Sequence, residues 1–190
     1  MANELPPFQS LAGHLLIATQ DEAGTFFYKT VILITHHTEQ DGAVGYVINR
    51  DIKTVSLKDV FKHRDISSIS PKLSLKNGGP VDLGHGIVLH TDDYKTIDTK
   101  QIANHLAITE TQQILDDISD QICPHHFMIL IGKSAWAPGQ LEEEIMSNMW
   151  IVADPTIELV FQVPDNKKWQ EALATLKIDS NLWTNHAGKA

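Results

Sequence analysis

Residues 31–50 read VILITHHTEQDGAVGYVINR, and the two apolar runs inside this stretch decide the fold. Val31–Thr35 and Val44–Ile48 are short and rich in Val and Ile, which predicts β-strands. Their apolarity is continuous rather than alternating, as is typical of strands that are covered on both faces. No helical pattern separates them from each other or from an earlier apolar run, Leu15–Ala18. These three strands are therefore predicted to form a meander.

Later parts of the chain alternate between strand and helix patterns. Three more apolar runs predict buried strands: Ile87–His90, Phe127–Ile131 and Trp150–Ala153. Amphipathic patterns predict helices that begin near Ser56, at Thr109, at Pro138 and near Pro164–Asp165. Asp59 and Gln112 stand three residues after the first two of these starts, a spacing that resembles a capping box. The sequence thus predicts an α/β fold with helices that flank a mixed β-sheet.

The segment NGGPVDLGHGIVLH, residues 77–90, combines four glycines with two histidines. A phosphate cradle needs a helix start with Lys and Ser or Thr after its glycines, and none follows here. His85 and His90 would lie about 16 Å apart along a strand, too far to share a metal ion. Turn chemistry remains: Asn77–Pro80 is predicted to end one strand, and Asp82–Gly86 to turn the chain into the next.

Length and charge favour one domain that does not bind nucleic acid directly. The 190 residues suit a single domain, 1–190, with residues 1–10 as a flexible N-terminal arm. The net charge is −9, from 24 acidic and 15 basic residues, and Arg50 and Arg64 are the only arginines. Because DNA and RNA binders place a basic patch against the phosphates, nucleic acid is not an expected partner.

A cytoplasmic protein without a membrane segment is expected. Cys123 is the only cysteine, so no intrachain disulfide can form. The first residues carry Glu4 and two prolines where a signal peptide has a basic region. The longest apolar run, Phe127–Ile131, is far too short to span a bilayer.

No catalytic constellation, cofactor motif or metal site is predicted. The ten histidines include two adjacent pairs, but strand neighbours point to opposite faces and no metal-ligand spacing occurs. Gly132-Lys133-Ser134 resembles the end of a phosphate-binding loop, yet Phe127 stands where that loop needs a glycine. No nucleophile elbow is present.

Two segments are candidates for binding. Asn49 and Arg50 directly follow a predicted strand, at the kind of edge where α/β folds hold ligands, and the Arg50 guanidinium suits a carboxylate or phosphate. The alternative for Arg50 is a structural ion pair with an acid among Glu142–Glu144. Trp136 stands among small residues ahead of a predicted helix, either as a core plug or as an anchor for a partner.

Several motifs in the same order resemble the AlgH/YqgE family of small bacterial proteins: GHLLIAT, GAVGYVINRD, NGGPVDLGHGIVLH, GKSAWAPGQLEEEI with the following Asn148 and Trp150, and KIDSNLWTNHAG. The resemblance covers about residues 11–188. It implies an α/β sandwich around a complex mixed β-sheet and a cytoplasmic location. Members are largely uncharacterised and often labelled transcriptional regulators, and no enzymatic activity is established for them.

The resemblance also implies which residues line a binding cleft: Asn49, Arg50, Gly78, Gly79, Pro80, His90, Trp136, Gly139, Gln140, Glu143, Asn148 and Trp150. The sequence departs from the family pattern at several positions. Asp51 replaces a usual proline, Tyr46 a leucine and Lys133 a tyrosine. Ala135 and Ala137 replace glycines, which narrows the backbone angles available beside Trp136.

The leading interpretation is a non-enzymatic binding protein that regulates gene expression indirectly. It would hold a protein partner or a small anion in a shallow cleft between Asn49-Arg50, the glycine segment and the Trp136 loop, as a monomer or weak homodimer. Two alternatives stay open. One is a direct DNA-binding transcriptional regulator, and the other is a hydrolase or transferase that uses Arg50, His90 and Glu143.

Overall fold

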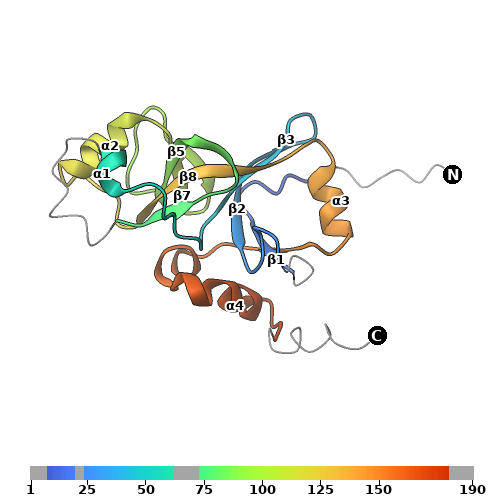
Figure 1. Ribbon diagram of the computed structural model, residues 1–190. Helices are drawn as coiled ribbons and strands as arrows, with labels where there is room; N and C mark the ends of the chain where they lie inside the picture. The colour runs from blue at the N-terminus through green and yellow to red at the C-terminus, as the bar shows by residue number, and fades with distance from the viewer. Residues whose placement is uncertain (1–7, 20–23, 62–72, 180–190) are drawn as a thin grey trace.

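One curled β-sheet carries the fold, and helices lie against it on several sides (Figure 1). The computed structural model describes residues 8–19, 24–61 and 73–179. Within them the strands are β1 Leu15–Ala18, β2 Val31–Thr38, β3 Gly42–Val47, β4 Leu75–Asn77, β5 Val81–Thr91, β6 Lys100–Ala103, β7 Leu106–Thr109, β8 Phe127–Trp136 and β9 Trp150–Ala153. The helices are α1 Leu57–Phe61, α2 Gln112–Ser119, α3 Gln140–Met146, α4 Asp165–Thr175 and the π-helix η3, Glu158–Gln162. None of these helices is long and apolar enough to cross a membrane.

Two of the sequence expectations fall partly outside the described residues. Most of the predicted N-terminal arm lies in residues 1–7, and most of the last family motif lies in residues 180–190.

The sheet is mixed, as the sequence predicted. Its strands follow the order β6-β7-β5-β8-β3-β2-β1-β9, and all neighbours in this order are antiparallel. β4 stands outside the order and pairs with β8 in parallel. The long strand β8 joins the two halves of the sheet, because its first residues pair with β5 and its last residues with β3. The predicted meander of β1, β2 and β3 is confirmed.

The central strands are buried on both faces, which their continuous apolarity predicted. Leu15 and Ile17 of β1 pack into one hydrophobic cluster, whereas Leu16 and Ala18 pack into another. β8 is divided among all three clusters, with Trp136 at its end in the cluster of Leu16 and Ala18. Full burial of a Leu or Ile side chain contributes about 1.5–3 kcal/mol, so these short strands are stabilised from both sides.

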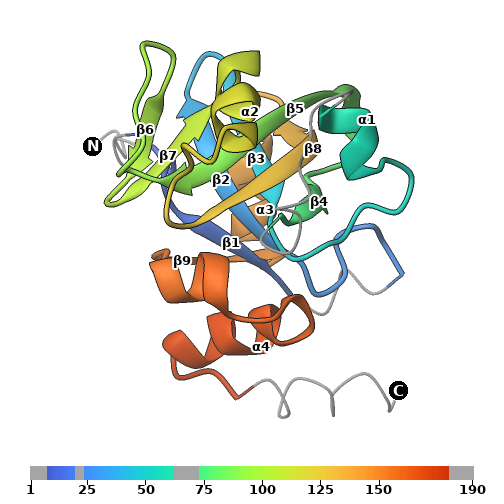
Figure 2. The same cartoon turned by 90° about the vertical axis from the view of Figure 1, so that its left-hand side faces the viewer.

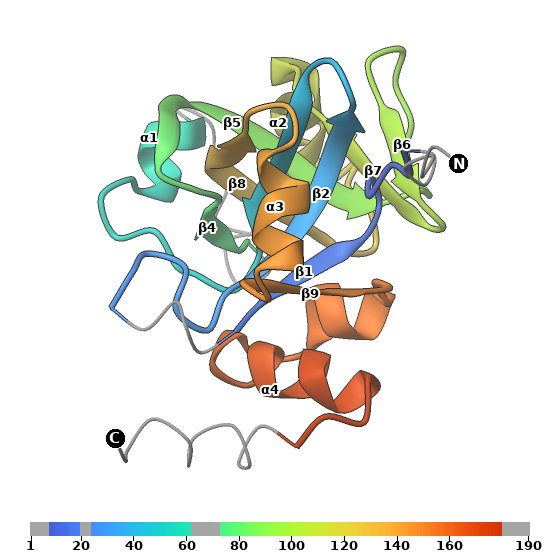
Figure 3. The ribbon, with the colours of Figure 1, turned by 90° about the vertical axis from the view of Figure 1, so that its right-hand side faces the viewer.

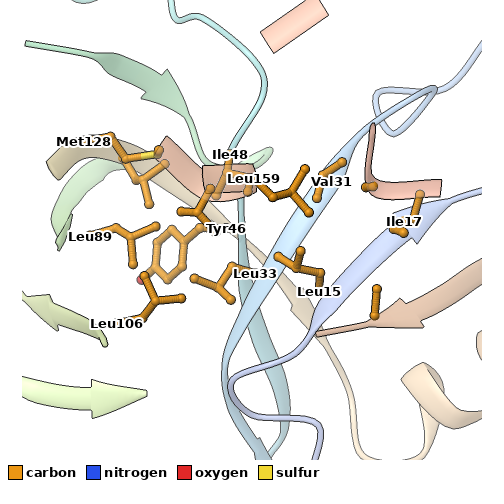
Figure 4. Packing of buried hydrophobic residues seen from close by; sticks show 14 of the residues in the cluster. Leu15, Ile17, Val31, Leu33, Tyr46, Ile48, Leu89, Leu106, Met128 and Leu159 are labelled. Atoms are coloured by element: carbon orange, nitrogen blue, oxygen red, sulfur yellow. The ribbon is translucent and has the colours of Figure 1, made fainter. Parts of the chain in front are cut away.

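The largest cluster lies between the sheet and the segment formed by η3 and α4. Figure 4 shows the Tyr46 ring of β3 among Leu33, Leu89 and Leu106, which come from three other strands. Burial raises the pKa of the Tyr46 hydroxyl to about 12. Residues of the C-terminal segment complete the cluster: Leu159, Val160, Trp169, Ala172 and Leu173.

The sheet curls until one edge approaches the chain that enters β1. A Cβ atom added at Gly13 would collide with the carbonyl oxygen of Ile102 in β6, although β6 and β1 stand far apart in the strand order.

The face of the sheet opposite to η3 and α4 is covered in two places. α1 and α2 pack over β5 and β8 (Figure 2), and α3 packs over β1, β2 and β3 (Figure 3). A mixed α/β fold with flanking helices is thus confirmed, and the finer expectation of a sandwich stays a prediction.

The helices begin near the predicted positions, with one exception. The capping box of α1 is formed, since the Ser56 N–H donates to Asp59 Oδ2 at 3.0 Å and the Asp59 N–H donates to Ser56 Oγ at 3.3 Å. The start predicted at Thr109 is wrong, because Thr109 ends β7 and Thr111 precedes α2. The Thr109 hydroxyl is held in the core, 2.9 Å from His90 Nε2, and is not available to a helix end.

The glycine segment shapes the junction between β4 and β5. Asn77 ends β4 and its Oδ1 accepts the Gly79 N–H at 3.2 Å, so the first predicted turn is confirmed. Gly78 passes so close to β8 that an added Cβ would collide with the carbonyl oxygen of Gly132. The second predicted turn, at Asp82–Gly86, is wrong. The register shifts there by a bulge, and β5 keeps β8 as its partner on both sides of it.

Candidate functional site

A hollow of about 490 Å³, here called the α4 hollow, lies between the end of β3, the turn before β2 and the first half of α4. Its lining residues are Tyr28, Lys29, Asn49, Arg50, Asp51, Lys53, Asp165, Asn166, Trp169 and Gln170. Two of the residues predicted to bind a ligand, Asn49 and Arg50, thus line the same hollow.

Asn49 builds one wall of the α4 hollow. Its Oδ1 accepts the Val31 N–H at 2.9 Å, and its Nδ2 donates to the Lys29 carbonyl at 2.9 Å. These two bonds fasten the turn before β2 to the end of β3 and so bring Tyr28 and Lys29 beside Arg50. The Asn49 side chain therefore shapes the hollow through its hydrogen bonds to the backbone of Val31 and Lys29.

Cations gather in the α4 hollow although the whole chain carries a net charge of −9. Arg50, Lys29 and Lys53 all line it. The Lys29 ammonium lies 5.3 Å from the centre of the Trp169 ring, close enough for a cation–π contact. Within the described parts of the chain, the Tyr28 carbonyl is the only hydrogen-bond acceptor of the Arg50 side chain. The remaining donors of the guanidinium are left for water or a ligand.

Two carboxylates of the α4 hollow belong to an ion network of Asp51, Lys76, Asp165 and Lys168. The buried Lys76 ammonium lies 2.7 Å from Asp51 Oδ1 and binds Asp165 Oδ2, and Lys168 Nζ lies 3.7 Å from Asp165 Oδ1. The hydrogen bond from Lys76 lowers the pKa of Asp51. Burial favours the neutral amine of Lys76, but the hydrogen bonds to Asp165 and Asp51 outweigh it and raise the pKa of Lys76. Because two lysines offset the two carboxylates, the three other cations give the hollow a net positive charge.

A second, larger space lies on the other side of Asp165. It has a volume of about 580 Å³ and is here called the Lys168 cavity. Its lining residues are Ser74, Lys76, Cys123, Pro124, His125, His126, Phe127, Met128, Phe161, Gln162, Val163, Pro164, Asp165 and Lys168. η3 supplies part of one wall, where the Phe161 and His126 rings stack with centroids 5.7 Å apart. Single π-helical turns are frequent at functional sites.

The predicted tryptophans lie elsewhere, in the core under α3. Trp136 Nε1 and Trp150 Nε1 both donate to Glu144 Oε2 at 2.7 Å, and Gln140 Nε2 donates to Glu144 Oε1 at 2.9 Å. Both indoles are buried, and their rings meet edge to face with centroids 6.0 Å apart. Of the two readings of Trp136, the structure shows the core plug.

Four other predicted residues belong to α3 or to the residues next to its ends. Gly139 precedes the helix with a φ of 79°, a conformation in which a Cβ would be strained. Glu143 is exposed on the first turn, and Asn148 is exposed just beyond the last one. Gln140, whose Nε2 donates to Glu144 Oε1, is the first residue of the same helix.

The predicted ion pair between Arg50 and an acid of α3 is not formed within the described residues. Arg50 donates to the Tyr28 carbonyl instead. Glu142 Oε1 lies 3.0 Å from His37 Nε2, and Glu144 accepts from the two indoles. The charge of Arg50 therefore remains available in the α4 hollow.

The glycine segment and His90 also lie apart from the α4 hollow. Gly78 accepts the Val47 N–H at 2.8 Å and donates to the Ile131 carbonyl at 2.8 Å, while Gly79 is buried and Pro80 is exposed beside it. His90 is fully buried: Nδ1 lies 2.8 Å from the Thr91 carbonyl oxygen and Nε2 lies 2.9 Å from the Thr109 hydroxyl.

His90 should make stability fall in mild acid. Burial lowers its pKa below the ordinary 6.5, although Asp93 and Asp92 oppose this shift. The unfolded chain therefore binds a proton before the folded one, so the stability that His90 contributes is complete above pH 6.5 and is lost as the pH falls toward the folded pKa. We expect a slope of up to about 1.4 kcal/mol per pH unit there.

The check is urea unfolding at several pH values. His90→Gln should flatten the slope relative to that of the unaltered protein. An unchanged slope in His90→Gln would contradict the assignment.

Sequence reasoning missed the residues of the ion network. Lys168 did carry a signal, since it stands four residues before Ala172 and so falls on the predicted apolar stripe of α4. Lys76 lies in a three-residue strand, and neither it nor Asp165 is marked by a motif. Among the residues that the structure describes, no three His, Cys, Asp or Glu side chains are grouped to hold a metal ion.

These features define the class: an α/β domain with a curled mixed sheet and a cationic hollow beside its C-terminal helix. Comparison with known proteins then identifies the family. Residues 15–181 match the AlgH-like family model, and the chain belongs to the AlgH-like family. The recognition made from the sequence motifs is confirmed.

The chain is also similar to several known relatives and solved structures. A UPF0301 protein of Gluconobacter oxydans is 37% identical over 183 residues, which cover 95% of this chain and 98% of the relative. A UPF0301 protein of Ruegeria pomeroyi is 35% identical over 95% of this chain and 99% of its own length. The solution structure of the AlgH protein from Pseudomonas aeruginosa matches with a TM-score of 0.74 and 30% identity over 100% of both chains. A crystal structure of a Corynebacterium diphtheriae protein matches in fold, with a TM-score of 0.71 and 20% identity over 90% of both chains.

Proposed function

We propose that this protein is a binding protein that holds an anionic group in the α4 hollow. It acts on gene expression indirectly, through the partner or small molecule that carries this group. The observation that supports the proposal most is the gathering of Arg50, Lys29 and Lys53 in a chain whose net charge is −9.

The chemistry of the hollow favours a carboxylate or a phosphate as the bound group. A guanidinium presents a planar fork of donors that matches the oxygens of either anion, and most of the donors of Arg50 are not used within the described residues. Lys29 lies over Trp169, so its ammonium is placed beside an aromatic wall. Tyr28 is 38% exposed at the rim and adds apolar contact for the rest of a ligand.

The two alternative functions find less support. Direct DNA binding would need a broad basic surface, whereas the cations of the α4 hollow form one small group on an acidic protein. The enzyme hypothesis needs Arg50, His90 and Glu143 together. Arg50 lines the α4 hollow, His90 is buried between β5 and β7, and Glu143 is exposed on α3.

Arg50→Ala should abolish most of the anion binding. Citrate and an oligoglutamate peptide serve as probes, followed by isothermal titration and by the amide NMR shifts of residues around the hollow. We expect the affinity for the probe that binds to fall about tenfold or more, because a hydrogen bond to a charged group contributes about 1.5–3 kcal/mol. Binding should also weaken as salt rises.

Lys58→Ala is the matched control, since it removes one exposed positive charge from α1. A response to citrate points to a small anion, and a response to the peptide alone points to an acidic segment of a protein. The proposal fails if neither probe shifts the hollow residues, or if Arg50→Ala binds as tightly as the unaltered protein.

A further inference from the structure

Lys168 places a primary amine in the wall of the Lys168 cavity. Its side chain is only 2% exposed, and it projects from the first half of α4. Nζ donates to the Val160 carbonyl at 2.7 Å and to the Ile48 carbonyl at 3.2 Å. Asp165 Oδ1, at 3.7 Å, is its nearest charged neighbour. The amine is therefore fixed in place by two neutral acceptors.

The pKa values of the two buried lysines of the cavity are shifted in opposite directions. Lys76 binds carboxylate oxygens of both Asp51 and Asp165, and these bonds raise its pKa. Lys168 has only the more distant Asp165 oxygen, so burial dominates and lowers its pKa to about 8. The positive charge of Lys76 lowers it further. A lysine that is desolvated beside a second cation is a recognised form of activated amine.

When the amine is neutral, one of the three positions around Nζ carries no hydrogen. Two N–H groups are committed to the carbonyls of Val160 and Ile48. In the ammonium, the third N–H is left for the side of Asp165. When this proton leaves, the lone pair takes that position. Lys168 and Asp165 both line the Lys168 cavity, so the amine belongs to the wall of the space that a ligand would occupy.

We propose that Lys168 is a carbonyl-reactive amine, and that the Lys168 cavity admits a small molecule with an aldehyde or ketone group. A volume of about 580 Å³ falls in the range of small-molecule sites. Phe161 and Phe127 offer apolar walls, and His125 and His126 offer polar groups for the rest of the ligand. This proposal concerns a different space from the α4 hollow and does not depend on anion binding there.

The reaction is a condensation. The Lys168 ammonium first loses a proton to Asp165 Oδ1 or to water. The neutral Nζ attacks the carbonyl carbon, the C=O electron pair moves to oxygen, and that oxygen takes up a proton. One Nζ hydrogen is lost when the carbinolamine forms and the second when water leaves and the C=N bond forms, so an amine and a carbonyl give an imine and one water. The hydrogen bonds to Val160 and Ile48 are therefore released in the imine. No oxidant or reductant is needed.

Reductive trapping tests the proposal. The folded, full-length protein is incubated with glyoxylate and cyanoborohydride at about neutral pH, and the modified lysines are located by peptide mass spectrometry. We expect Lys168 to react at least about tenfold faster than Lys167, an exposed lysine on the same helix. The rate at Lys168 should rise with pH through a midpoint of about 8.

Two variants separate reactivity from a structural role. Lys168→Arg keeps the positive charge and the donors to Val160 and Ile48, but it cannot form an imine. It should fold and lose the fast-reacting fraction, whereas Lys167→Arg should keep it. The proposal is overturned if Lys168 in the folded protein reacts no faster than Lys167, or if Lys168→Arg incorporates the probe as fast as the unaltered protein. A purely structural lysine, buried and protected, would give the first of these results.

Discussion

Replacing Asp165 with alanine is expected to lower the free energy of unfolding by about 3 kcal/mol. Asp165 is the residue that joins the two lysines of the ion network. Its Oδ2 binds Lys76, whose side chain is 9% exposed, and its Oδ1 lies 3.7 Å from Lys168. Removing one partner from a buried ion pair leaves a charge that neither water nor an opposite charge compensates. Asp51 remains beside Lys76 and Asp165 is 26% exposed, so we expect the lower end of the usual range.

Urea unfolding followed by circular dichroism measures the effect. Glu171→Ala is the matched control, because Glu171 is an exposed acid on the same helix, and its removal should change the free energy by less than about 0.5 kcal/mol. Asp165→Asn should fall between the two, since an amide can accept one bond but carries no charge. If Asp165→Ala were as stable as the control, the ion network would not contribute to folding.

The fold could be predicted from the sequence wherever a segment is buried on both faces. The six continuous apolar runs all became strands, because their burial does not depend on one particular partner. β6 and β7 were missed: they are short, and β6 is half polar. Thr109 was assigned to a helix start because the capping pattern is local, whereas its hydroxyl bonds to His90, nineteen residues earlier in the chain.

The candidate site was predicted only in part, for a related reason. The end of a buried strand indicated Asn49 and Arg50, which line the α4 hollow, and their role in binding stays a prediction. The facing wall comes from α4, and no local pattern links Lys76 to Asp165, which are 89 residues apart. Helical periodicity placed Trp169 in the core but could not reveal that the neighbouring Lys168 would reach carbonyls of β3's end and η3. Contacts of this kind depend on how far the sheet curls.

Replacing Glu144 with alanine is expected to destabilise the protein by about 3 kcal/mol and to change its tryptophan fluorescence. One carboxylate oxygen, Oε2, accepts the indole N–H groups of Trp136 and Trp150, each at 2.7 Å. Both indoles are 5% exposed or less, so the loss of the carboxylate leaves their N–H groups without a protein acceptor. A buried donor without a partner costs about 1–3 kcal/mol, and here two are left.

Glu143→Ala is the control that makes this result specific. Glu143 is the neighbouring acid on α3 but is exposed, and its loss should change the free energy by less than about 0.5 kcal/mol. Glu144→Gln should lie between them, because its amide oxygen can still accept from the indoles while its NH₂ group faces the Gln140 donor. Unfolding followed by fluorescence and by circular dichroism should give the same midpoint for each variant. Equal stability of Glu144→Ala and Glu143→Ala would show that the indoles do not need this carboxylate, and Trp136 would again be open to a role as a partner anchor.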